Sequence, residues 1–163
     1  MKYLYILRHA KTSWDSVTDF TRQLDTRGKT QAKQLGKYLK QRDIQFDAIY
    51  TSSATRAILT TQIVAEEIEY KETHIEEHLA LYEAKVIDLL NFVQALPTSK
   101  NTVLIVGHNN TVSNFCNYIL KEPIGDIPTC GLVAIRFSVT TWAEVDKQIG
   151  ELLQYKKPDD SLL

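Results

Sequence analysis

Cysteine is scarce in this sequence, since only Cys116 and Cys130 occur among 163 residues. Two cysteines cannot build the disulfide framework on which small secreted proteins depend, so we interpret both as reduced thiols in the core. Long apolar runs are also missing. The run at the start, Tyr3 to Leu7, is too short for the apolar segment of a signal peptide, and no later run could span a membrane. We therefore expect a cytoplasmic protein with no membrane association.

An excess of charge of either sign is missing as well. The formal net charge at pH 7 is −1, with 19 basic and 20 acidic residues, and no block of like charges forms a tail. Nucleic-acid-binding surfaces usually carry a basic excess, so we expect no nucleic-acid partner. Any site for an anion must be local, built from a few cations that converge in the fold.

The sequence contains no internal repeat, low-complexity stretch or linker. A chain of 163 residues is long enough to bury one hydrophobic core. We therefore expect a single domain over residues 1–163, with the polar segment 156–163 as a frayed tail. Nothing in the pattern of surface residues indicates more than a monomer.

Strands and helices are predicted to alternate along the chain. Short apolar segments typical of strands occur at 2–8, 46–53, 101–108, 130–139 and 149–155, and helical periodicity occurs at 26–43, 54–69, 86–96 and 109–120. Residues 73–81 are expected to form a strand that leads into a loop. The alternation predicts an α/β fold, a three-layer α/β/α sandwich around a mostly parallel sheet. The last two strand segments lack a convincing helix between them, so we expect a mixed sheet.

Residues suited to phosphate chemistry follow three of the predicted strands. Arg8 and His9 follow the first, Ser52 to Arg56 follow the second, and Gly107 and His108 end the segment at 101–108. Because the carboxyl ends of parallel strands share one edge of a sheet, we expect these residues to converge there. Arginine presents a planar fork of donors that matches phosphate oxygens, and helix N-termini add backbone N–H groups. One histidine could attack phosphorus while a second stabilises charge on the transferring group.

The family resemblance rests on four stretches, which occur in the same order as in the histidine phosphatase superfamily: LRHAKTSW, DFTRQLDTRGKTQA, IYTSSATRAILTTQIV and VLIVGHNNTVS. They resemble in particular its SixA-like branch of phosphohistidine phosphatases, with the phosphoglycerate mutase-like fold. The resemblance implies that His9 is a nucleophile that forms a covalent phosphohistidine, that Arg8 and Arg56 bind the phosphoryl oxygens, and that His108 stabilises their charge. Arg22, in a stretch resembling the family's D-x-x-R-x-L, is a further candidate for phosphate or substrate contact.

The sequence departs from the wider superfamily at two points. The common Arg-His-Gly is Arg8-His9-Ala10 here, an alternative that the SixA-like branch tolerates. No acidic residue aligns securely with the general acid of the mutase and acid-phosphatase members. Glu83, in LALYEAKV, lies in about the right region, but a solvated carboxylate explains it equally well. A missing acid favours phosphohistidine as the substrate, because its labile P–N bond releases a neutral imidazole once protonated.

These features predict a metal-independent phosphatase without a cofactor, which hydrolyses phosphohistidine on proteins through phospho-His9. One alternative is a phosphatase of small phosphate esters, such as phosphorylated metabolites, with Glu83 as general acid. Another is a non-catalytic phosphate-binding module. The segment HIEEH, residues 74–78, also fits the H-x-x-E-H pattern of a zinc hydrolase. That pattern requires a helix and a third ligand, whereas these residues are predicted to form a strand and a loop, so we disfavour it.

Overall fold

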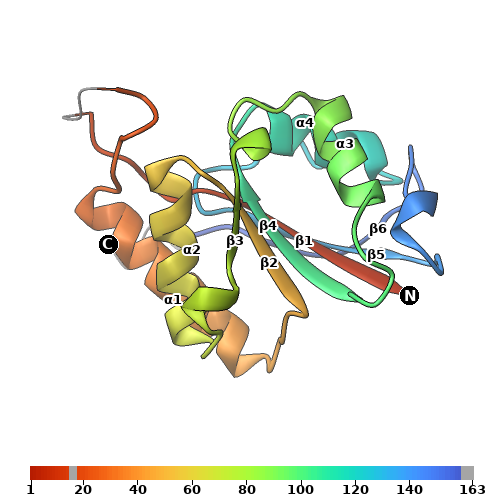
Figure 1. Cartoon of the computed structure of the whole chain (residues 1–163), viewed down its shortest axis with the longest axis horizontal. Coiled ribbons are helices and arrows are strands. Elements are labelled where there is room, and N and C mark those ends of the chain that lie inside the picture. Colours follow the sequence, from red (N-terminus) through yellow and green to blue (C-terminus); the bar gives the residue numbers. More distant parts are fainter. Residues whose placement is uncertain (15–17, 159–163) are drawn as a thin grey trace.

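The computed structural model of the chain describes residues 1–14 and 18–158. Its strands and helices alternate as the sequence predicts (Figure 1). The strands are β1 (Lys2–Arg8), β2 (Ala48–Ser52), β3 (Glu76–His78), β4 (Thr102–Gly107), β5 (Leu132–Phe137) and β6 (Glu151–Lys156). The helices are α1 (Thr26–Gln41), α2 (Thr55–Glu67), α3 (Val86–Gln94) and α4 (Thr111–Ile119), with single helical turns at Glu72–His74, Leu79–Leu81 and Trp142–Glu144.

All six strands form one mixed sheet in the order β3-β2-β4-β1-β5-β6. The first four are parallel to one another, whereas β5 runs antiparallel to β1 and β6 antiparallel to β5. The prediction of a mostly parallel sheet that becomes mixed near the C-terminus is therefore confirmed. Its central strands β1 and β4 are buried on both faces, which explains why they read as nearly continuous apolar runs.

The helices cover both faces of this sheet, as a three-layer sandwich requires. Helices α1 and α2 pack together on one face, and α3 and α4 lie on the other (Figure 1). The chain moves outward from β1 to β2 to β3 and then returns to β4. Since crossover connections are right-handed, that reversal of direction changes the face on which the connecting helix lies.

The start of α1 is pressed against the segment that follows β1. A Cβ on Gly28 would lie 2.0 Å from the carbonyl oxygen of Lys11, so only glycine permits this approach. Asp25 caps the helix, because its side chain accepts a hydrogen bond from the backbone N–H of Gly28 at 2.7 Å. Helix α1 thereby supports the backbone just beyond Arg8 and His9.

The end of the last strand differs from the sequence-based expectation. Strand β6 continues through Lys156, one residue into the segment predicted as a frayed tail, because that residue pairs with Leu132 of β5. The remainder of that prediction falls partly on residues 159–163, which lie outside the described residues. No helix in the described part of the chain is long and apolar enough to cross a membrane.

Candidate active site

The candidate site lies at the carboxyl ends of β1 and β4, two neighbouring strands whose following helices lie on opposite faces of the sheet. Arg8 is the register partner of Gly107, and the backbone N–H of His9 donates to the carbonyl oxygen of Gly107 at 3.1 Å. This pairing brings His9 and His108 together, with ring centroids 5.2 Å apart. A reversal of strand connection at this edge is where α/β sheets commonly form ligand sites.

His9 is buried in a state suited to a nucleophile. Its side chain is almost covered, at 8% exposure, and its Nδ1 lies 2.8 Å from the carbonyl oxygen of Ala10. A carbonyl only accepts, so Nδ1 is assigned the proton and Nε2 carries the lone pair. Burial lowers the pKa of His9 to about 3; the hydrogen bond with Ala10 opposes this shift, and the positive charges of Arg56 and Arg8 add to it. His9 is therefore neutral at pH 7.

His108 lies opposite His9 and is also neutral at pH 7. Burial lowers its pKa to about 4, with further lowering by the positive charge of Arg56. Its Nε2 lies 2.7 Å from the hydroxyl oxygen of Ser52, and the ring of Tyr82 packs edge-on against it at 5.6 Å. Its Nδ1 is buried and has no hydrogen-bond partner among the described residues.

Arg8 and Arg56 are both anchored at one end of the guanidinium. Nη1 of Arg8 donates to the carbonyl oxygen of Ile127 at 2.9 Å. Arg56 donates from Nη1 to the backbone carbonyl of Asp19 at 2.7 Å and from Nη2 to its carboxylate at 3.1 Å. In both arginines Nε is buried and has no partner within the described part of the chain. Buried N–H groups are rarely left unpaired, so both Nε groups are candidate donors to an oxygen of a bound anion.

Thr60 connects the elements that carry His9 and Arg56. Its side chain is fully buried on α2, accepts a hydrogen bond from the backbone N–H of Ala10 at 3.0 Å, and donates to the carbonyl oxygen of Arg56 at 2.8 Å. A single hydroxyl therefore fixes the segment after β1 against the first turn of α2. Thr60 belongs to no motif in the sequence, and its position four residues after Arg56 on the same helix is the one sequence feature that connects it to the site.

Arg22 is not brought into contact with the two histidines. Its side chain donates to the Ser13 carbonyl and the Thr12 hydroxyl, pairs with the Asp19 carboxylate at 3.2 Å, and lies 3.6 Å from the centre of the Trp14 ring. It reaches Arg56 only through Asp19, which binds both arginines. The role of Arg22 as a direct phosphate contact therefore stays a prediction.

Asp19 and Tyr82 are neighbours of the site that the sequence analysis missed. The Tyr82 hydroxyl donates to the Asp19 carboxylate at 2.6 Å. This bond, followed by the contacts of Arg56 and Arg22, lowers the pKa of Asp19 to about 2. The carboxylate is thus ionised at neutral pH. Asp19 stands three residues before Arg22 in the same D-x-x-R pattern, and that pattern is the signal that could have found it.

Glu83 is adjacent to Tyr82 in the sequence and has no polar partner among the described residues. It is exposed, and its carboxylate makes no hydrogen bond or ion pair with the described residues. Its negative charge contributes to raising the pKa of Tyr82, for which the hydrogen bond to Asp19 is the main cause. The structure therefore places Tyr82, and not Glu83, against His108.

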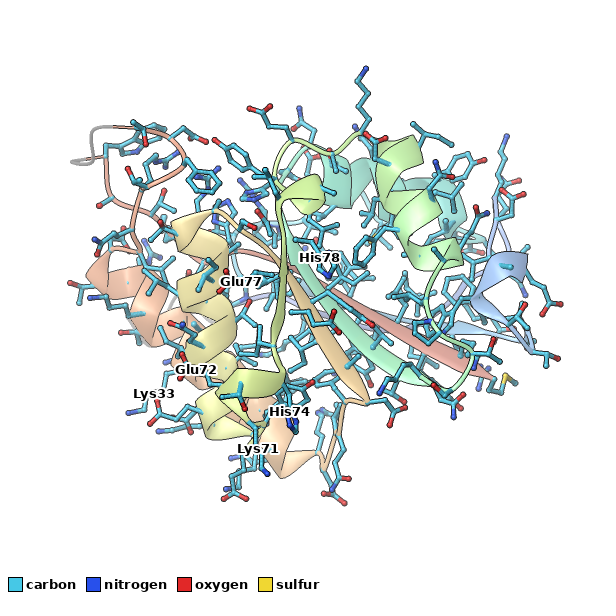
Figure 2. All side chains as sticks on the ribbon, viewed as in Figure 1. Lys33, Lys71, Glu72, His74, Glu77 and His78 are labelled. Atoms are coloured by element: carbon cyan, nitrogen blue, oxygen red, sulfur yellow. The ribbon has the colours of Figure 1, made fainter. Side chains whose placement is uncertain are left out.

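The HIEEH segment does not form a zinc-binding helix. His74 ends a single helical turn and packs against Tyr70, whereas His78 ends β3 and packs against Phe92. Figure 2 shows the two histidines at opposite ends of this segment. The described residues contain no group of three histidine, cysteine or acidic side chains arranged to hold a metal ion. The strand predicted for this segment is confirmed, although it is only three residues long.

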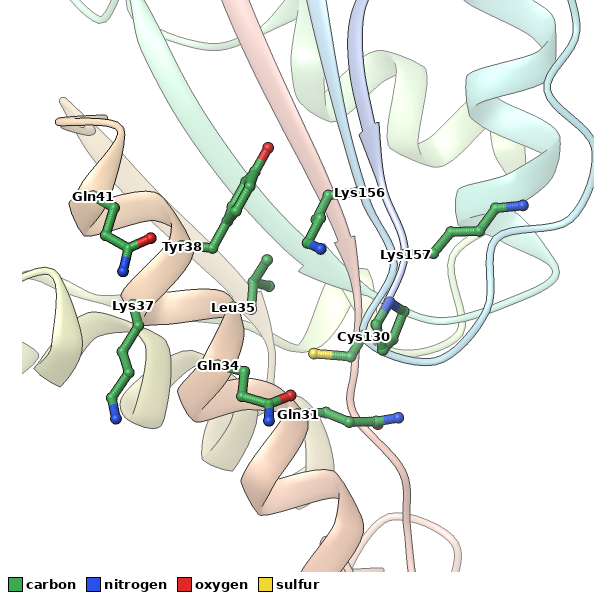
Figure 3. Close-up of a pocket in the computed structure, with 10 residues that line it drawn as sticks. Gln31, Gln34, Leu35, Lys37, Tyr38, Gln41, Cys130, Lys156 and Lys157 are labelled. Carbon is green, nitrogen blue, oxygen red and sulfur yellow. The ribbon is translucent and has the colours of Figure 1, made fainter. Parts of the chain in front are cut away.

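A separate pocket of about 250 Å³ lies between α1 and the end of β6 (Figure 3). Leu35, Tyr38, Cys130 and Lys156 are among its lining residues. None of His9, Arg8, Arg56 and His108 lines it. Cys130 nevertheless connects the two regions, because its backbone N–H donates to the carbonyl oxygens of Arg8 and His9, both at 3.0 Å. Burial raises the pKa of the Cys130 thiol to about 12, so the thiol stays protonated.

A family model for the histidine phosphatase superfamily (branch 1) matches residues 4–88, which is more than half of the chain. The chain belongs to this superfamily. Among curated relatives, the mitochondrial serine/threonine-protein phosphatase Pgam5 of Drosophila persimilis is 25% identical over 94% of this chain. The chain spans 62% of the length of that relative.

Solved structures of the superfamily share the fold over nearly the whole chain. A protein assigned as the phosphohistidine phosphatase SixA of Agrobacterium tumefaciens is 25% identical, with a TM-score of 0.79 over 96% of this chain and 98% of its own. The protein histidine phosphatase SixA complexed with tungstate is 19% identical, with a TM-score of 0.84 over 96% of this chain and 97% of its own. The predicted phosphoglycerate mutase-like α/β fold is thus confirmed.

Proposed function

We propose that this chain is a metal-independent phosphatase that removes the phosphoryl group from phosphohistidine on proteins. One observation carries the proposal. Neutral His9, with Nε2 free, lies beside three buried nitrogens that lack partners among the described residues: Nε of Arg8, Nε of Arg56 and Nδ1 of His108. A nucleophile next to unpartnered donors is what phosphoryl transfer requires, because positioning and charge stabilisation are most of the catalysis.

In the proposed reaction, Nε2 of His9 attacks phosphorus in line with the leaving group. A P–N bond to His9 forms as the P–N bond of the substrate breaks. A substrate ring that is protonated on its other nitrogen departs as neutral imidazole. Arg8, Arg56 and His108 bind the phosphoryl oxygens throughout. Water then attacks phospho-His9, which releases inorganic phosphate and restores the neutral imidazole of His9.

The carboxylates near the site support phosphohistidine over a phosphate ester. An ester leaves as an alkoxide and gains from a positioned general acid. Asp19 is ionised at neutral pH, since its pKa lies near 2, and Glu83 is exposed without a polar partner in the described structure. Asp19 therefore holds no proton to deliver, and no contact in the described structure fixes Glu83 beside the two histidines. The SixA structure with tungstate, a tetrahedral oxyanion, also supports an oxyanion site in this fold.

The test is a paired assay in the presence of EDTA. One reaction contains a phosphohistidine-bearing phosphotransfer domain, and the other contains a panel of small phosphate esters. His9→Ala is expected to abolish turnover, and His74→Ala is the matched histidine control, because His74 lies on a distant helical turn. Rapid loss of phosphohistidine with slow ester hydrolysis is the expected result. Faster ester hydrolysis would favour the small-phosphate alternative, and no turnover by the wild type would favour the binding module.

A further inference from the structure

The hydroxyl of Ser52 occupies a fixed place between two polar groups. Ser52 ends β2 and is fully buried. Its Oγ accepts a hydrogen bond from the backbone N–H of Ala54 at 3.2 Å and lies 2.7 Å from Nε2 of His108. The bond with Ala54 has only one possible direction, because an amide N–H is a donor only.

The single proton of the Ser52 hydroxyl then needs an acceptor. Within the described part of the chain, the hydrogen bonds of this hydroxyl are those with Ala54 and His108, so Nε2 of His108 is the available acceptor. An Nε2 that accepts carries no proton. Since His108 is neutral at pH 7, its one ring proton must then be on Nδ1, the buried nitrogen that lacks a partner.

We propose that Ser52 is a positioning residue that holds His108 in the tautomer protonated at Nδ1, so that Nδ1–H donates to an oxygen of the bound phosphoryl group. The inference rests on the function proposed above, because it explains why Nδ1 of His108 carries the proton that it would donate to a phosphoryl oxygen. It gives Ser52 a role that its position in the TSSATR stretch does not reveal.

The opposite tautomer would be costly at both ends of the ring. If Nε2 of His108 donated to Ser52, the buried Ser52 hydroxyl proton would lack an acceptor among the described residues. A buried donor without an acceptor destabilises the arrangement that contains it. Nδ1 would also present a bare lone pair to an anionic oxygen, which repels it. When Ser52 donates, its hydroxyl proton is paired with Nε2 of His108, and the Nδ1–H of His108 gains its acceptor when a phosphoryl oxygen binds.

The decisive experiment is a long-range ¹H–¹⁵N correlation spectrum of the His108 imidazole at pH 7, with the signals assigned through His108→Gln. The wild type is expected to show a protonated Nδ1 and an unprotonated Nε2. Ser52→Ala is expected to move His108 toward the tautomer protonated at Nε2. Ser53→Ala is the matched control, because it removes the adjacent hydroxyl and leaves the bond between Ser52 and His108 in place. Ser52→Thr keeps a hydroxyl and is expected to preserve the wild-type tautomer.

Kinetics give a second measurement. Ser52→Ala is expected to lower kcat by about tenfold, which is less than the roughly 10²-fold or greater loss when one oxyanion donor is removed altogether. A wild-type His108 with an unprotonated Nδ1 would overturn the proposal, as would a Ser52→Ala variant with unchanged tautomer and kcat. If the wild type failed to hydrolyse phosphohistidine, the proposed function would fail. The spectrum would still report whether Ser52 sets the tautomer.

Discussion

Asp19 holds Arg56 through two of its own atoms, the backbone carbonyl at 2.7 Å and the carboxylate at 3.1 Å. The neighbouring Phe20 extends this attachment, because its carbonyl oxygen accepts the backbone N–H of Thr55 at the start of α2. The segment before α1 therefore sets the orientation of an arginine that belongs to α2. The Nε of this anchored guanidinium is buried and has no partner in the described structure.

Arginine geometry at position 56 is expected to matter for anion affinity. Arg56→Lys keeps the charge but loses the planar fork, so vanadate should bind at least about tenfold more weakly. Arg22→Lys is the matched control, since Arg22 is engaged by Asp19, Thr12 and Ser13. Its expected change in affinity is less than about threefold. Equal losses in the two variants, measured by calorimetric titration with vanadate, would place Arg22 in direct contact with the anion.

The two buried histidines should stay neutral well into the acid range. The pKa values of His9 and His108 lie near 3 and 4, below the ordinary 6.5. Between about pH 6.5 and 4 the unfolded chain binds protons that the folded chain does not, so the free energy of unfolding falls as pH falls. The slope is at most about 1.4 kcal/mol per pH unit for each group. Imidazole signals from these two residues that titrate near pH 6.5 in NMR spectra would contradict this account.

Glu83→Gln tests the general-acid alternative directly. Because the carboxylate is exposed and has no polar partner among the described residues, its loss should change phosphohistidine hydrolysis by less than about twofold. Initial rates on both substrate classes provide the measurement, with Glu77→Gln as a control at an exposed carboxylate of β3. A selective fall in ester hydrolysis would assign the proton-donor role to Glu83.

Thr60→Val should destabilise the folded protein by about 1–3 kcal/mol, because it leaves the N–H of Ala10 buried without its acceptor. Thr60→Ser retains the hydroxyl and should lose less. Urea unfolding followed by circular dichroism measures both variants. If the serine variant were as unstable as the valine variant, the lost methyl packing would account for the effect instead of the hydrogen bond.

The sequence was most informative where a residue's role follows from its strand. Arg8 ends one buried strand, His9 follows it, and His108 follows another, so the parallel arrangement of β1 and β4 places them together without further information. Arg56 opens the helix after β2 for the same reason. Local sequence patterns are sufficient to predict that these residues lie together, because the pairing of β1 with β4 in the sheet makes the long-range contact.

The same reasoning fails for side chains that reach the site from loops. Tyr82 follows a single helical turn, and Asp19 lies in an irregular segment, so no periodicity relates either residue to β1 or β4. Their contact joins positions that are 63 residues apart. The carboxylate of Glu83 made it a candidate general acid in the sequence, whereas the structure places the ring of the adjacent Tyr82 against His108.

The turn before β5 has a consequence for the order in which the site can be completed during synthesis. Ile127 accepts the hydrogen bond from Arg8, and the backbone groups of Cys130 and Gly131 hold the end of β1. During translation, these residues are added to the chain after every residue that is proposed to act on phosphate. A growing chain that has reached His108 but not Ile127 therefore contains all the proposed reacting groups. It still lacks the backbone groups that hydrogen-bond to Arg8 and His9 and fix their positions.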